Sequence, residues 1–165
     1  MNCIIRKKEI KDCSSIEKVI TKSWQQTYKG IINQETLDNL FTNEEERIHY
    51  SIKNFNNNDY ETYVLEVNKQ VVGFVNCGES REYKNTGEIF ALYIIEEYQG
   101  YGYGTELFLN AYNCLKNQGY NKVIVGCIDK NKSNKFYENI GCIKIGTRII
   151  EKSGQKFVEN IYVYN

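Results

Sequence analysis

The chain has 165 residues, the length of one domain with a sizeable core, and its 21 basic residues are balanced by 21 acidic ones. This balance gives no overall positive field, so we expect no nucleic-acid partner. The sequence has no apolar run of 18 residues and no cleavable leader, so we expect a cytoplasmic protein without a membrane segment. Six cysteines without C-x-x-C spacing and a single histidine offer no metal site.

The first part of the chain predicts one strand followed by helices. Residues 2–7 are a strand candidate, and Asp12 can cap the helix that follows. Apolar residues recur at helical spacing from Ile16 to Tyr28, and Gly30 is a fitting end to that helix. Two shorter helices and a polar break are expected at residues 33–41, 43–55 and 56–59.

The middle of the chain predicts a hairpin and a buried strand. Two β-rich runs, residues 62–67 and 70–77, are joined by Asn68-Lys69, which is a two-residue hairpin signal. A charged loop at residues 78–86 leads to the strand at residues 88–95, which is rich in Ile, Leu, Phe and Tyr.

A glycine-rich turn, Gln99-Gly-Tyr-Gly-Tyr-Gly104, follows this strand and precedes a helix. Apolar residues then fall at helical spacing from Leu107 to Leu115. The order strand, glycine-rich turn, helix N-terminus directs several backbone N–H groups and the positive end of a helix dipole at one place. Such a place favours a phosphate group.

Three phosphate-binding patterns compete for this turn. A Walker loop needs a lysine, which is missing here, and the dinucleotide pattern G-x-G-x-x-G meets Thr105 or Leu107 where its last glycine should stand. The third pattern, Q/R-x-x-G-x-G/A, is matched by Gln99, Gly102 and Gly104.

The last third of the chain predicts one more helix among three strands. Gly119 ends the preceding helix, and a short helix capped by Asn131 or Ser133 ends at Gly141. The strands are expected at residues 122–129, 142–151 and 155–164, with Ser153-Gly154 between the last two. The order β-α-α-α-β-β-β-α-β-α-β-β predicts one α/β domain, residues 1–165, with a mixed sheet and helices on both faces.

The glycine-rich turn and its lead-in L-Y-I-x-x-E-Y-Q-G resemble motif A of the GNAT family of N-acetyltransferases. A second resemblance lies downstream, in Asn131-x-Ser133-x-x-Phe136-Tyr137-Glu138-x-x-Gly141, although Cys142 stands where the family has Phe. The opening I-R-K-K-E-I-K-D is similar to the family's first strand. The run S-W-Q-Q-T-Y-K-G-I-I, residues 23–32, is similar to a bacterial subgroup with Trp-x-x-x-Tyr-x-Gly.

The resemblance implies a GNAT-like domain with a mixed, mostly antiparallel sheet of about seven strands. It implies an acetyl-CoA-dependent N-acetyltransferase in which a primary amine, preferably of a small molecule, attacks the thioester directly. A non-catalytic acyl-CoA sensor and a peptide or protein N-acetyltransferase are the alternatives. Family members of this size are often dimers, so a homodimer stays open.

The resemblance also implies which residues hold the cofactor. The turn would bind diphosphate through backbone amides, and the strand before it would meet the pantetheine arm. These predicted cofactor contacts are Leu92, Tyr93, Ile94, Gln99, Gly100, Tyr101, Gly102, Tyr103, Gly104, Thr105, Asn131 and Ser133. An amide near Ile94 would polarise the thioester carbonyl. The side chains of residues 92–94 are equally explained as core, and Asn131 and Ser133 as helix caps.

Two residues are the catalytic candidates. Glu88, a carboxylate in an otherwise apolar strand, is the predicted base for the amine, directly or through a water. A solvated position at the strand's exposed start is the alternative. Tyr137 matches the family's acid for the departing thiolate, and an aromatic anchor between helix and sheet is the alternative.

The resemblance implies that Trp24, Tyr28 and Ile32 shape the acceptor side, because the family's first two helices border that pocket. Trp24 at helical spacing is also typical of core. Cys127 and Cys142 lack an adjacent activating histidine, so we do not expect a covalent acetyl-enzyme.

Overall fold

The structure, a computed structural model, describes residues 2–57 and 59–165, so one residue of the predicted polar break, Asn58, lies outside the described residues. Its sheet has the strand order β1-β2-β3-β4-β5-β7-β6, and only β4 and β5 run parallel. The strands among these described residues are β1 (Cys3–Lys7), β2 (Glu61–Val67), β3 (Gln70–Glu79), β4 (Thr86–Ile94), β5 (Lys122–Ile128), β6 (Ile143–Lys152) and β7 (Gln155–Tyr164). The predicted mixed, mostly antiparallel sheet is confirmed.

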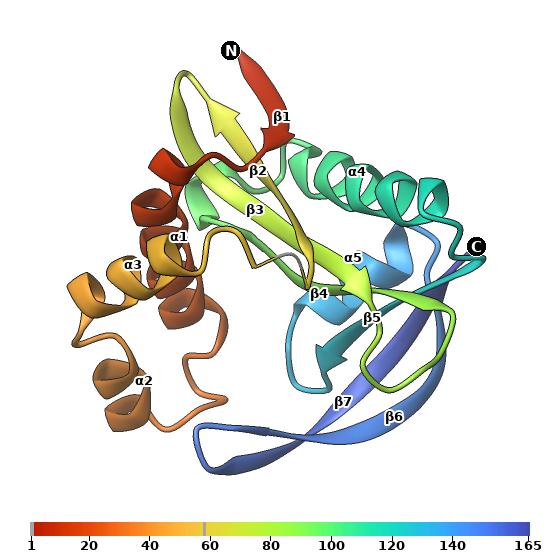
Figure 1. Cartoon of the computed structure of the whole chain (residues 1–165). Helices are drawn as coiled ribbons and strands as arrows, with labels where there is room; N and C mark the ends of the chain where they lie inside the picture. The colour runs from red at the N-terminus through yellow and green to blue at the C-terminus, as the bar shows by residue number, and fades with distance from the viewer. Residues whose placement is uncertain (1, 58) are drawn as a thin grey trace.

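Helices cover both faces of the sheet (Figure 1). Their bounds are α1 (Cys13–Thr27), α2 (Gln34–Leu40), α3 (Glu44–Lys53), α4 (Tyr103–Asn117) and α5 (Ser133–Asn139), with short 3₁₀ turns at Ile10–Asp12 and Glu96–Tyr98. The first three lie on one face, and α4 and α5 lie on the other. No helix of the described part of the chain combines the length and apolar composition that crossing a membrane requires.

Turn chemistry explains the two tight hairpins. Asn68 and Lys69 have φ of 50° and 68°, and Ser153 and Gly154 have φ of 53° and 74°. A two-residue turn with both central residues in the left-handed region matches the twist of the strands it connects. The hairpin predicted at Asn68-Lys69 is therefore confirmed, and the second hairpin places Lys152 at the far end of β6.

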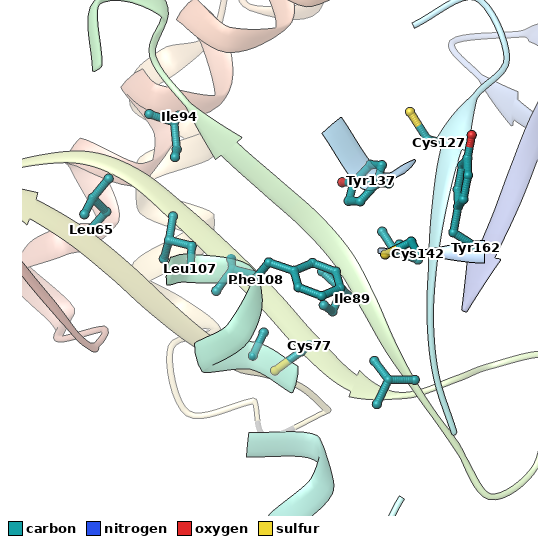
Figure 2. Close-up of a cluster of buried hydrophobic side chains, with 14 of the residues drawn as sticks. Leu65, Cys77, Ile89, Ile94, Leu107, Phe108, Cys127, Tyr137, Cys142 and Tyr162 are labelled. Atoms are coloured by element: carbon teal, nitrogen blue, oxygen red, sulfur yellow. The ribbon is translucent and has the colours of Figure 1, made fainter. Parts of the chain in front are cut away.

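The main core lies between the sheet and the two helices α4 and α5 (Figure 2). Leu107 and Phe108 of α4 pack against Leu65 and Ile89 of the strands, and each side chain is at most 2% exposed. Tyr137 of α5 belongs to the same cluster. The helix after the glycine turn thus buries its apolar stripe as the sequence pattern predicts.

A β-bulge decides where the sheet opens. On β3, Asn76 pairs with Ala91 and Cys77 pairs with Ile89, so Phe90 of β4 has no partner there. The pairing of β4 with β5 also ends at this level, because its last pair is Ile89 with Val125. A bulge bends its strand and increases the local twist, which directs β4 away from β5.

A buried ion-pair network crosses the sheet on the face of α1. Arg148 of β6 donates to Glu159 of β7 at 2.5 Å and to Glu88 of β4 at 2.7 Å, and it also reaches the exposed Glu82 at 3.1 Å. Ser80 donates to the second oxygen of Glu88 at 2.7 Å. The solvated alternative for Glu88 is therefore wrong, because the strand begins two residues earlier and the side chain is 4% exposed within it.

Removing the cation of this network should destabilise the protein strongly. Arg148→Met leaves two buried carboxylates without their shared partner, and breaking a buried ion pair in this way costs roughly 3–5 kcal/mol. We expect that loss in the free energy of unfolding from urea titration at neutral pH.

Lys144→Met, at an exposed position of the same strand, is the matched control and should change stability by less than about 0.5 kcal/mol. An Arg148→Met protein as stable as the control would show that the network contributes nothing.

Candidate active site

The diverging strands enclose a cavity of about 380 Å³. Its walls come from β4 beyond the bulge, from β5 beyond its last pair, from the glycine-rich turn, and from parts of α1, α5, β6 and β7. The lining residues are Thr27, Tyr28, Ile89, Phe90, Ala91, Leu92, Tyr93, Ile94, Gln99, Gly100, Gly102, Gly104, Thr105, Val125, Gly126, Cys127, Ile128, Asn131, Ser133, Phe136, Tyr137, Lys152 and Glu159.

The glycines of the turn have different structural reasons. Gly100 and Gly102 have φ of 82° and 85°, a region that side chains rarely adopt, and Gly102 is the N-cap of α4. At Gly104 the constraint is space, because a Cβ there would lie 3.2 Å from the ring of Phe136. Gln99 fixes the turn from the other side by donating to the Ile94 carbonyl at 2.8 Å. The turn therefore presents its backbone to the cavity.

Two tyrosines of the turn lie elsewhere. Tyr101 and Tyr103 stack on each other at a ring-centroid distance of 5.8 Å, and neither lines the cavity. Tyr101 is 60% exposed. Their predicted contact with the cofactor therefore concerns the main chain only, and it stays a prediction.

The start of α5 is fixed by an asparagine that sequence reasoning did not single out. The side chain of Asn134 donates to the carbonyls of Ile128 and Asn131 at 2.8 and 2.7 Å, and its oxygen accepts from Asn160 and Tyr162, each at 2.9 Å. This cluster ties the helix to β5 and β7.

Asn131 and Ser133 both line the cavity at this point. The Asn131 side chain accepts a hydrogen bond from the Ser133 backbone N–H at 2.8 Å, which satisfies one of the donors at the start of the helix. The N-cap position of α5 is held by Lys132, and Ser133 is the first residue of the helix, so the predicted N-cap assignment is wrong. Both Asn131 and Ser133 remain beside the cavity. Their contact with a cofactor stays a prediction.

Tyr137 reaches the cavity from α5, on the face opposite the ion-pair network. The side chain is 6% exposed, and its ring lies edge to face with that of Phe136. Burial, followed by the neighbouring Cys127, raises the pKa of Tyr137 above that of an ordinary phenol. The group therefore carries its proton at neutral pH. Both interpretations of Tyr137 agree with this position, since it anchors the helix and also lines the cavity.

The face of α1 contributes one predicted acceptor residue to the cavity. Tyr28 lines it, and its hydroxyl lies 3.3 Å from that of Tyr93 on β4. Trp24 packs behind Tyr28 with ring centroids 4.8 Å apart, and Ile32 is 2% exposed in the cluster below. Trp24 and Ile32 therefore support the wall without forming part of it.

The predicted base, Glu88, is not among the described residues that line the cavity. Both its oxygens accept hydrogen bonds, one from Ser80 and one from Arg148. Glu159, held by the same Arg148, does line the cavity. Sequence reasoning did not single out Glu159. The signal available for it was the alternation of the last predicted strand, because this alternation places Glu159 on the same face of the sheet as Phe157.

The position of Glu159 depends on Gly126 of β5. A Cβ at Gly126 would lie 2.4 Å from the Glu159 carboxylate, which is closer than any real contact. The carboxylate thus lies directly over the β5 backbone, between Arg148 and the cavity.

The second charged wall residue is Lys152, which the sequence also did not indicate. Its ammonium lies 4.8 Å from the ring centroid of Trp24 and 5.9 Å from that of Tyr28. Burial lowers the pKa of Lys152, while Glu159 acts in the opposite direction.

Cys127 also lines the cavity. Burial, followed by Glu159, raises the pKa of the Cys127 thiol to about 12. Because the thiolate is the nucleophile, a thiol that stays protonated is poorly suited to accept an acetyl group. Cys142 is buried and lies outside the lining.

Comparison with known proteins identifies the family. Residues 21–142 match the model of the Acetyltransferase (GNAT) family. The chain is 28% identical over 158 residues to the protein named Uncharacterized N-acetyltransferase YuaI from Bacillus subtilis strain 168, covering 94% of this chain and 88% of that protein.

Solved structures share the fold. The PaiA N-acetyltransferase of Thermoplasma acidophilum, solved with coenzyme A, is 22% identical with a TM-score of 0.71, over 97% of this chain and 98% of that chain. The YncA structure from Salmonella typhimurium, solved with acetyl-CoA, is 20% identical with a TM-score of 0.72, over 98% and 92%. With most of its length matched by the family model, this chain belongs to the GNAT family of acetyltransferases.

Proposed function

We propose that the protein transfers the acetyl group of acetyl-CoA to a primary amine of a small molecule, by direct attack of the amine on the thioester. The observation that carries this proposal is one cavity that runs from the glycine-rich turn, between the separated β4 and β5, to a buried phenol and a carboxylate. The family and the CoA-bound relatives support the choice of donor.

The residues present fit acetyl-CoA. Gly100 and Gly102 expose backbone next to the N-terminus of α4, where backbone N–H groups favour a diphosphate. Residues 90–94 of β4 lie beyond the last pair with β5 and offer a free strand edge to an amide-containing arm. When bound, acetyl-CoA supplies the activated acyl group.

The amine must lose its charge before it can attack, because an alkylammonium has a pKa of about 10.4. Glu159 lines the cavity and is the better placed of the two carboxylates to hold the ammonium group and take its proton, directly or through a water. Neither Glu88 nor Arg148 lines the cavity, and Arg148 links Glu88 to Glu159. The role of Glu88 as the base stays a prediction, which is tested together with that of Glu159.

Tyr137 is the proposed partner of the departing thiolate. A phenol that keeps its proton at neutral pH can donate a hydrogen bond to the developing negative charge. Complete proton transfer would run uphill, because a thiol has a pKa of about 8.5. Stabilisation of the thiolate by the hydrogen bond is therefore the main effect we expect from Tyr137.

The proposed donor can be tested by ligand-dependent stability. Acetyl-CoA and CoA should raise the melting temperature, whereas ATP and NADH should not, and a ligand at 100 times its Kd stabilises by about 2.7 kcal/mol. Thiol release from acetyl-CoA is then measured with small amines and with peptides. No stabilisation by CoA would contradict the proposal, and stabilisation without thiol release for any amine would favour a sensor. Turnover with peptides alone would favour a peptide N-acetyltransferase.

Loss of the phenol should slow the reaction without weakening CoA binding. Tyr137→Phe keeps the ring and is expected to lower kcat about 10²-fold, the lower end of the effect of a positioned acid. The stabilisation by CoA should be unchanged. Tyr112→Phe, which alters a ring outside the cavity, is the matched control. Equal turnover of the two variants would remove Tyr137 from the mechanism.

The two carboxylates can be separated by matched substitutions. Glu159→Gln should lower kcat/KM for the amine about 10²-fold, with the larger loss at lower pH, where free amine is scarcest. Glu88→Gln should lower it by less than about tenfold. A larger, acid-weighted loss for Glu88→Gln would instead identify Glu88 as the base. Urea titration of both variants shows whether either effect reflects lost stability.

A further inference from the structure

Lys152 is a cation of the cavity wall that forms no direct ion pair with the residues that the structure describes. Among the residues that the structure describes, no carboxylate lies within ion-pair distance of its ammonium, which rests over the rings of Trp24 and Tyr28. Aromatic faces stabilise a cation, but they leave its hydrogen-bond donors unused. The side chain lines the cavity, so those donors are available to a molecule inside it.

Glu159 provides the opposite charge on the same surface. Arg148 occupies one of its oxygens, and no described residue forms a hydrogen bond with the other. The paired strands place Arg148 opposite Glu159, and Lys152 faces the same side because it lies an even number of residues along β6 from Arg148. Lys152 and Glu159 are thus neighbouring and opposite charges on one wall.

An apolar surface separates these two charges. Ile150 and Phe157, which pair with each other on β6 and β7, lie between them and pack with Tyr28 and Tyr93. Ile150 and Phe157 lie behind the cavity wall, whose lining includes Tyr28 and Tyr93. A ligand that touched both charges would pass these two rings with a hydrocarbon segment. Because Glu159 lines the same cavity as Tyr137 and lies over the β5 backbone at Gly126, its charge marks the reacting end.

We propose that the acceptor is an amino-carboxylate, whose ammonium group is held by Glu159 and whose carboxylate is bound by Lys152. This inference rests on the proposed function and adds the class of acceptor. A second ammonium group at the Lys152 end would meet a like charge, so diamines are selected against. A neutral end would leave the ammonium group of Lys152 without a bound anion.

Acceptors of equal length test this class directly. A series of ω-amino carboxylates from glycine to 6-aminohexanoate is compared with the matching diamines and alkylamines. Wild-type protein should give its highest kcat/KM with a carboxylate, at least tenfold above the diamine of the same length. The length that gives the highest value measures the spacing between the two sites.

Substitutions at one position should then change the preference in a defined order. Lys152→Met should reduce the advantage of carboxylate over alkylamine to less than about twofold, and Lys152→Glu should favour the diamine. Lys156→Met, on the exposed face of the same hairpin, should behave as wild type. Equal preference in wild type and Lys152→Glu would overturn the inference.

Binding is measured separately from turnover, so that the experiment distinguishes an error in the proposed acetyl transfer from an error in the proposed recognition of the acceptor. In the presence of CoA, the best ω-amino carboxylate should raise the melting temperature of wild type and not of Lys152→Glu. If it binds in this way without thiol release, the acetyl transfer is wrong and the recognition stands. If amines and diamines bind as well as the carboxylate, the recognition is wrong whatever the turnover.

Discussion

The site depends on the separation of two parallel strands. Because Phe90 is an extra residue on β4, that strand bends where its pairing with β5 ends. Beyond this level both strands have free backbone edges, and the space between them connects the two faces of the sheet. Tyr137 enters it from the side of α5, and Glu159 from the side of α1. Without the bulge the sheet would continue, and these side chains would lie on opposite sides of a closed layer.

The two ends of this space differ in how they are built. At the glycine-rich turn the cavity wall is largely backbone, which suits a ligand that every member of a family shares. At the other end the wall is made of side chains from β6, β7 and α1, including both of its charges. Those side chains can change without altering the turn, so the two ends of the cavity are structurally independent.

Much of the fold followed from local patterns. The hairpin at Asn68-Lys69, the strand before the glycine turn and the apolar stripe of α4 were predicted because each depends on neighbouring residues. The charged wall could not be predicted in this way. Arg148, Glu159 and Lys152 look like ordinary strand charges, and only the order β4-β5-β7-β6 brings Arg148 to Glu88. The sequence indicated a carboxylate in an apolar strand, but not the cation that crosses two strands to meet it.

The structural reason for a glycine at position 126 differs from the reason at Gly100 and Gly102 of the turn. Its backbone is of a kind that any residue can adopt, yet the Glu159 carboxylate occupies the volume where a side chain would begin. Even a methyl group there would displace the carboxylate and the arginine bound to it. The missing side chain therefore keeps a negative charge on the cavity wall, and alanine, a change tolerated at most glycines of ordinary conformation, would relocate that charge.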